Sequence, residues 1–84
     1  MLYQFTAVAD SIRVVLTNAV GNFIVGETVA ATTSGSTGVV KSWDSTGNIL
    51  VISNPTAYFV IPERVTGASS GALGDVQSST NVYV

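Results

Sequence analysis

Hydrophobic positions in this chain follow the two-residue period of β-strands. Short runs of branched and aromatic residues alternate with polar ones, and no window keeps the i, i+3, i+4 apolar stripe of a helix over three turns. Clusters of Gly, Asn, Asp, Ser and Pro separate these runs at fairly even intervals. The pattern predicts an all-β fold, a small barrel or sandwich. The expected strands lie near 2–8, 12–17, 27–32, 37–44, 48–53, 57–61, 63–68, 73–79 and 81–84.

The chain also contains an internal repeat. At an offset of 36, residues 14–48 align with residues 50–84 without a gap, and ten of the 35 aligned positions are identical. We interpret this as a duplicated β unit of about 36 residues within a single domain, residues 1–84. Residues 1–13 precede the repeat as an N-terminal strand or arm. The identical pairs are Val15/Val51, Asn18/Asn54, Phe23/Phe59, Glu27/Glu63, Val29/Val65, Ser34/Ser70, Gly35/Gly71, Gly38/Gly74, Val40/Val76 and Ser42/Ser78.

Comparing the two copies predicts which face of the strand at 37–44 is exposed. Strict alternation puts Trp43 on the same face as Val39 and Lys41, and the second copy has Asp75 in place of Val39. A face that carries Asp in one copy is a poor core position in the other. We therefore expect Trp43 on the outer face as an interface anchor, because Trp is enriched at binding hot spots. The alternative is that Trp43 folds over a barrel end as a lid on the core.

Composition favours a protein that is stabilised by partners. At 84 residues the chain buries only about 60% of its unfolded surface, and it has no Cys or His for a disulfide or a zinc site. Only 10% of residues are charged and 46% are hydrophobic. Strand 12–17 and its copy are apolar on both faces, so we expect a homo-oligomer, a dimer or trimer. The candidate contact residues are Tyr3, Phe5, Val15, Trp43, Val51 and Tyr83.

Charge and residue types argue against catalysis and nucleic-acid binding. Three basic residues and a net charge of −2 give no electrostatic footprint for nucleic acid. Without His, no serine can belong to a Ser-His-Asp triad. The repeated SG..G loop lacks the Lys of a phosphate-binding loop and lies between two expected strands, so it reads as a β-hairpin tip. We expect no enzyme activity, no catalytic residue, no cofactor and no metal.

Glu27 and Glu63 are the one pair of carboxylates that the repeat duplicates. Paired carboxylates can perform acid–base chemistry, but duplication already explains why there are two. We expect each to accept hydrogen bonds from turn amides or to pair with a basic side chain, at opposite ends of the fold. Asp44 begins the turn DSTGN, a position that Asp favours.

No membrane segment is expected. The longest apolar runs, ILVI and AYFVI, are far shorter than the roughly 20 residues of a spanning helix. The N-terminus has no basic region and contains Asp10 and Arg13, so it is not expected to be a signal peptide.

The motif F-x-V-G-E-x-V…S-G-x-x-G-x-V-x-S-W-D…L-x-V resembles the Gly/Ser/Thr/Val-rich repeats of tailed-bacteriophage virion proteins. It covers Phe23 to Ile52, and the second copy keeps Phe59, Glu63, Val65 and Gly74 but has Pro62 for Gly26 and lacks the W-D pair. The resemblance implies a virion structural protein. Its short length fits head decoration (cement) proteins, which bridge subunits of the major capsid protein on the capsid surface.

Two other interpretations remain open. The same repeats occur in tail, baseplate and fibre-associated proteins, which would place the protein on the tail. The run GETVAATTSGSTGVVKSWDSTGNILVI also has the shape of a small SH3-like or KOW-type module, although it lacks the basic and stacking residues with which such modules bind RNA.

Overall fold

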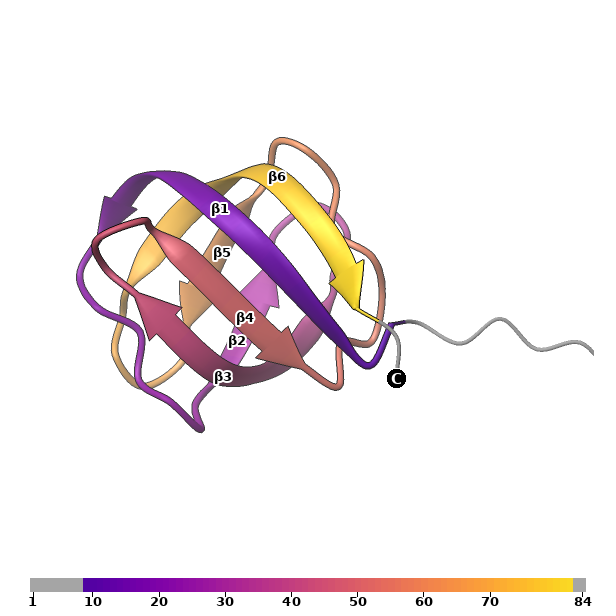
Figure 1. Cartoon of the computed structure of the whole chain (residues 1–84), viewed down its shortest axis with the longest axis horizontal. Coiled ribbons are helices and arrows are strands. Elements are labelled where there is room, and N and C mark those ends of the chain that lie inside the picture. Colours follow the sequence, from indigo (N-terminus) through magenta and orange to yellow (C-terminus); the bar gives the residue numbers. More distant parts are fainter. Residues whose placement is uncertain (1–8, 83–84) are drawn as a thin grey trace, which may run out of the picture.

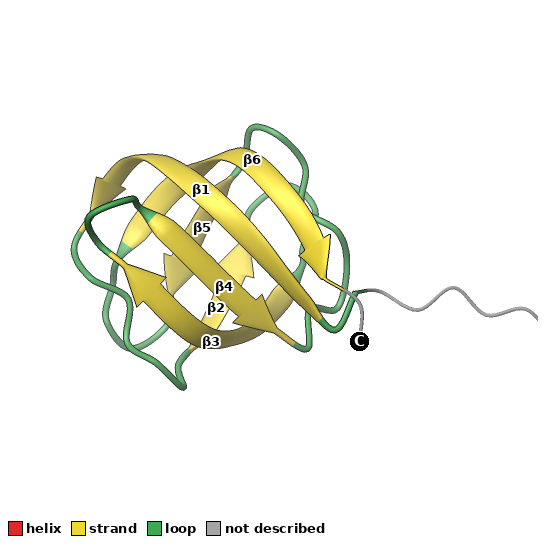
Figure 2. Ribbon diagram, viewed as in Figure 1, coloured by secondary structure: helices red, strands yellow, loops and turns green. Residues whose placement is uncertain are grey.

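The computed structural model describes residues 9–82, which form six β-strands and no helix (Figures 1 and 2). The strands are short and rich in Val, Ile and Thr, whose branched side chains pack well on a half-buried sheet. The strands are β1 (Ser11–Val20), β2 (Thr28–Ala31), β3 (Thr37–Asp44), β4 (Ile49–Ser53), β5 (Arg64–Gly67) and β6 (Leu73–Val82).

These strands close into a barrel. The order around it is β1-β4-β3-β2-β5-β6, and every neighbouring pair is antiparallel. In Figure 1 the first strand (indigo) and the last (yellow) run side by side and complete the ring. The all-β prediction is confirmed, and of the two architectures expected, the barrel is the one that forms.

The two halves of the barrel follow the 36-residue repeat. The bounds of β2 and β5 differ by 36 residues at both ends, and β3 matches the first eight residues of β6. Backbone hydrogen bonds recur with the same offset: the Val40 amide donates to Glu27 O (2.9 Å) and the Val76 amide to Glu63 O (2.8 Å). Exchanging the two units leaves the β1–β4 and β2–β5 pairings in place and exchanges the other four in pairs, so the barrel has an internal pseudo-twofold axis.

The two units are interleaved around the ring. Of the six strand pairings, only β2–β3 and β5–β6 lie within one unit. The other four, β1–β4, β1–β6, β3–β4 and β2–β5, join one unit to the other.

The barrel interior is packed with aliphatic side chains from both units. Space inside is so limited that Gly38 and Gly74, which are equivalent in the repeat, have no room for a side chain. A Cβ on Gly38 would collide with the Ile52 side chain, and one on Gly74 would lie 2.8 Å from Leu16 Cδ1. The buried hydrophobic residues are Ala9, Ile12, Val14, Leu16, Phe23, Val29, Ala31, Val40, Leu50, Ile52, Phe59, Val65, Ala72 and Val76.

A β-bulge in each unit changes which side chains face inward. On β3 the pairing passes from Val40↔Ile52 to Ser42↔Val51, which leaves Lys41 as an extra residue. The next pair is Trp43 with the fully buried Leu50, so Trp43 lies on the inner side of the sheet. The expectation of an outer-face Trp43 was wrong, because it assumed strict alternation through this bulge.

The same bulge occurs at Gln77 on β6, where Leu16↔Val76 is followed by Val15↔Ser78. It moves Ser79, the counterpart of Trp43, opposite the buried Val14. The irregularity is thus part of the duplicated unit.

Two predicted strand boundaries also need correction. Residues 57–61 form a loop rather than a strand, because they occupy the place that the loop at 21–25 has in the first unit. The strands expected at 73–79 and 81–84 are one continuous strand through Val82. The strand predicted at 2–8 lies outside the described residues.

Candidate functional site

The Glu27 carboxylate is buried and binds three backbone amides. The Ile24 amide donates to Oε2 (2.6 Å), within the same loop. The amides of Ser69 and Ser70, in the other unit, donate to Oε1 at 2.9 and 2.8 Å. Burial would raise the pKa of Glu27, but the hydrogen bonds from Ile24, Ser70 and Ser69 outweigh it and lower the pKa to about 2.

Glu63 makes the equivalent contacts from the second unit to the first. The Val60 amide donates to its Oε2 (2.6 Å), and the amides of Thr33 and Ser34 donate to its Oε1 at 2.9 and 2.8 Å. Burial would raise its pKa, but hydrogen bonds led by the Ser34 and Val60 amides lower it. Each carboxylate therefore ties a loop of its own unit to the hairpin of the other unit.

These contacts confirm the prediction that both glutamates accept hydrogen bonds from turn amides. The antiparallel β2–β5 register places them at opposite ends of that strand pair, since each precedes the first residue of its strand. A carboxylate that accepts hydrogen bonds from three amides and has a lowered pKa stays ionised at neutral pH and is a poor proton acceptor. It is thus suited to structural rather than acid–base work.

The repeated SG..G segments are the tips of the β2–β3 and β5–β6 hairpins. Gly35 and Gly71 adopt φ of 74° and 73°, which side-chain-bearing residues rarely adopt. Within each tip a serine hydroxyl accepts a backbone amide hydrogen bond: Ser36 N to Ser34 Oγ (3.1 Å) and Ala72 N to Ser70 Oγ (3.0 Å). The tips are shaped by their own side chains and by the glutamate of the other unit, which agrees with the predicted hairpin role.

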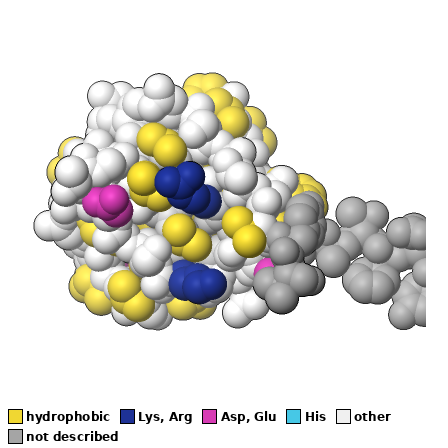
Figure 3. Space-filling model, in the orientation of Figure 1, with side chains coloured by type: hydrophobic (Ala, Val, Ile, Leu, Met, Phe, Trp, Pro, Cys, Tyr) yellow, Lys and Arg dark blue, Asp and Glu magenta, His cyan; other side chains and the backbone are white. Residues whose placement is uncertain are grey.

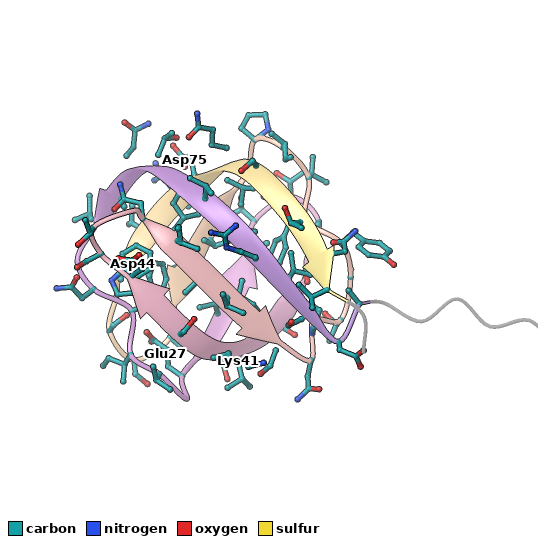
Figure 4. The ribbon with its side chains drawn as sticks, in the orientation of Figure 1. Glu27, Lys41, Asp44 and Asp75 are labelled. Atoms are coloured by element: carbon teal, nitrogen blue, oxygen red, sulfur yellow. The ribbon has the colours of Figure 1, made fainter. Side chains whose placement is uncertain are left out.

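The turn that begins at Asp44 also forms as predicted. Asp44 Oδ1 accepts hydrogen bonds from the amides of Thr46 (2.9 Å) and Gly47 (3.3 Å). Figure 4 shows Asp44 at the left side of the barrel, apart from Glu27 and Asp75.

Trp43 covers one end of the core. Its indole packs edge-to-face on the buried Phe23, with ring centroids 5.0 Å apart and an interplanar angle of 67°. The Nε1–H donates to Asn22 Oδ1 (3.1 Å). The lid interpretation thus describes its position, while part of the indole remains accessible and its role as a contact residue stays a prediction.

The outer face of β1 and β4 carries two of the other candidate contact residues, Val15 and Val51, both half-buried. Val15 pairs with Ile49 and Val51 with Arg13, so these four side chains form one outward patch. Figure 3 shows one face of the barrel, where hydrophobic side chains lie among polar ones and close to basic ones. The remaining candidates, Tyr3, Phe5 and Tyr83, lie outside the described residues.

Sequence reasoning missed a second exposed apolar feature at two loop tips. Ile24 and Val25 are 53% and 65% exposed, and their counterparts Val60 and Ile61 are 44% and 52% exposed. The repeat held the signal: F-I-V-G-E aligns with F-V-I-P-E, but a comparison restricted to identities passes over the exchanged Ile and Val.

Other kinds of site do not appear in the described part of the chain. Residues 9–82 enclose no pocket, and they hold no group of three or more His, Cys, Asp or Glu that could bind a metal ion. The same residues include no helix of the length and apolar character needed to cross a membrane.

Comparisons with family models, with curated proteins and with solved structures found no match to this chain.

Proposed function

We propose that the protein is a bacteriophage capsid decoration (cement) protein, which binds assembled coat subunits through its surface and stabilises the shell. The phage setting rests on the resemblance of the duplicated repeat to virion proteins. The mode of action rests on the barrel surface, and the proposed role is structural rather than enzymatic.

The observation that carries the proposal is the balance of side chains on that surface. Among residues 9–82, eight large hydrophobic side chains are exposed but only five charged ones. A solitary soluble domain normally covers its surface with charge, and exposed apolar groups mark contact sites. Two of the five acidic side chains, Glu27 and Glu63, are buried and therefore add no charge to the surface.

The patch formed by Arg13, Val15, Ile49 and Val51 is the proposed contact between copies in a dimer or trimer. It lies around the pseudo-twofold axis between β1 and β4, since the repeat exchanges Val15 with Val51 and Arg13 with Ile49. Hundreds of copies act on one particle, so each needs to contribute only a few kcal/mol, and binding to the assembled shell shifts its stability by mass action.

The proposal is tested by locating the protein in virions and then deleting it. Epitope-labelled protein should decorate the head, and heads that lack it should release DNA at lower temperature than complete heads. Label on the tail would favour the alternative of a tail or baseplate protein. Heads that withstand heating equally well without the protein would contradict the cement role.

A further inference from the structure

We infer that the two loop tips, Ile24–Val25 and Val60–Ile61, form a pair of equivalent docking sites with which one chain binds two copies of the same partner subunit. This inference concerns the partner's symmetry and does not depend on the phage setting. It uses a surface distinct from the β1–β4 patch.

The first argument is that both copies of the repeat have aliphatic residues at the exposed loop tips, where the side chains do not pack in the core. Each tip has a buried Phe before it and a buried Glu after it, which explains those residues by the core and the hydrogen bonds. The two residues that follow the Phe are aliphatic in both copies, yet all four are about half exposed or more. Other exposed hydrophobic residues are not kept in this way: the counterpart of Val39 is Asp75, and that of Val20 is Thr56.

The second argument is that both tips are held in place before any partner arrives. The carboxylate of Glu27 accepts the Ile24 amide, and the Gly26 amide donates to Val40 O (2.8 Å). In the second tip the carboxylate of Glu63 accepts the Val60 amide at the same distance, 2.6 Å. A preorganised loop loses little conformational entropy on binding.

The chemistry of the tips defines the partner. Residues 20–26 and 56–62 contain no charged side chain, so the complementary surface is a small, uncharged recess of aliphatic or aromatic groups. The absence of Lys and Arg also gives the tips no attraction for an anionic lipid surface. Both tips present one Ile and one Val, in exchanged order, so we expect a subunit that accepts one tip to accept the other.

The geometry favours two copies of a different protein over a second copy of this chain. The tips enter the β2–β5 pair at Thr28 and Arg64, at opposite ends, about 13 Å apart along the strands. If one tip of a copy bound the other tip of the next copy, assembly would continue into a ring or a filament. Residues 9–82 enclose no pocket that could receive a tip, so a second copy of this chain offers no matching recess. A homo-oligomeric partner that presents its recess twice satisfies both tips at once.

Site-specific photo-cross-linking tests this inference directly. A benzophenone amino acid is placed at Val25, at Ile61 or, as a control, at the exposed but unduplicated Val39, in the cells where the chain is naturally made. The cross-linked peptides are then identified by mass spectrometry. Val25 and Ile61 should reach the same segment of the same protein, and Val39 should not. Cross-links to two different proteins, only to other copies of this chain, or at no more than the Val39 level would overturn it.

Affinity for that partner gives a second, independent readout. The paired substitutions I24T/V25T and V60T/I61T keep β-branched shapes, and V39T is the matched control. Losing either tip should weaken binding to the partner oligomer by about 100- to 10,000-fold, because the second contact becomes unavailable. Equal unfolding midpoints would show that folding is intact. A tip variant that binds as tightly as V39T would contradict the two-site arrangement.

The outcomes separate this inference from the proposed function. A shared partner segment that belongs to no virion protein would remove the cement role but keep the two docking sites. If this chain is found on phage heads but its two tips cross-link to unrelated proteins, the cement role would stand and the pair of equivalent docking sites would be contradicted.

Discussion

Glu27 and Glu63 each gather three backbone N–H groups that strand pairing leaves without an acceptor. Hydrogen bonds to a charged group are stronger than neutral ones, and a buried donor without a partner is costly. All buried side-chain polar atoms of the described residues have partners, so these contacts leave no deficit. At the residue scale, the two buried glutamates stabilise the loops and hairpin tips of the barrel by accepting their amide hydrogen bonds.

Replacing Glu27 by Gln should lower the free energy of unfolding by about 2–3 kcal/mol. The Gln side chain has one oxygen for three amide donors, and its NH₂ group would face N–H groups. Urea unfolding followed by circular dichroism measures the change. E63Q should behave similarly, while D44N on the exposed turn should change stability by less than about 1 kcal/mol. Equal effects of E27Q and D44N would contradict the assigned role.

Acid should also weaken the barrel. The pKa of Glu27 is about 2 in the folded protein and 4.5 ordinarily, so its stabilising contribution is complete above pH 4.5 and is lost as pH falls toward 2. The loss from this group is on the order of 3 kcal/mol, and Glu63 adds a loss of the same sign. Urea unfolding at pH 7, 4.5, 3 and 2.5 measures it. The E27Q variant should show a flatter pH dependence.

Residue-level reasoning succeeded where chemistry is local. The Ile24 and Val60 amide contacts of the glutamates and the Asp44 turn join residues only two or three positions apart. The contacts of each glutamate with the hairpin of the other unit are long-range, and the sequence could not assign those partners. The exposure of Ile24 and Val60 was missed because an apolar residue in a sequence carries no sign of being left uncovered.

Elements were harder to predict where the strands are irregular. The bulge at Lys41 adds one residue to β3 and none to its partner β4, which shifts Trp43 to the inner side. Alternation cannot reveal such a shift, since it follows from the pairing with β4. The strand expected at 57–61 was an error of a different kind: its apolar residues suggested a strand, although the aligned loop at 21–25 contains turn residues.

Substituting Trp43 by Ala should lower the free energy of unfolding by about 2–3 kcal/mol, because it exposes Phe23 and removes their edge-to-face contact. Thermal unfolding followed by circular dichroism measures this loss. S79A, at the equivalent position of the second unit, is the control and should have a small effect. A W43A variant as stable as S79A would mean that the indole is not part of the barrel's core.

At the scale of the whole molecule, the closed barrel carries its exposed hydrophobic side chains on the outer wall and the loops, where the proposed contacts lie. The sequence could not distinguish a barrel from a sandwich, because short strands and even turn spacing occur in both. What distinguishes them is the pairing of β1 with both β4 and β6, which joins residues far apart in the chain.

The whole-molecule prediction is a homo-oligomer assembled through the β1–β4 patch. Light scattering at micromolar concentration should give a dimer or trimer mass. V51K should dissociate it, because a second positive charge would lie opposite Arg13 and be desolvated in the contact. A30K, on the exposed face of β2 at the opposite side of the ring, is the control. A wild-type monomer would contradict the prediction.

The interleaving of the two units has a consequence for how the chain folds and how it can be divided. Four of the six strand pairings cross between units, so each half has only one two-stranded hairpin that it can form by itself. Such a ring of non-local pairings closes slowly and cooperatively. A chain cleaved between Thr46 and Gly47, in the turn between β3 and β4, should therefore remain together as a complex of two peptides. Each peptide made alone should be unfolded, and mixing the two should restore the barrel.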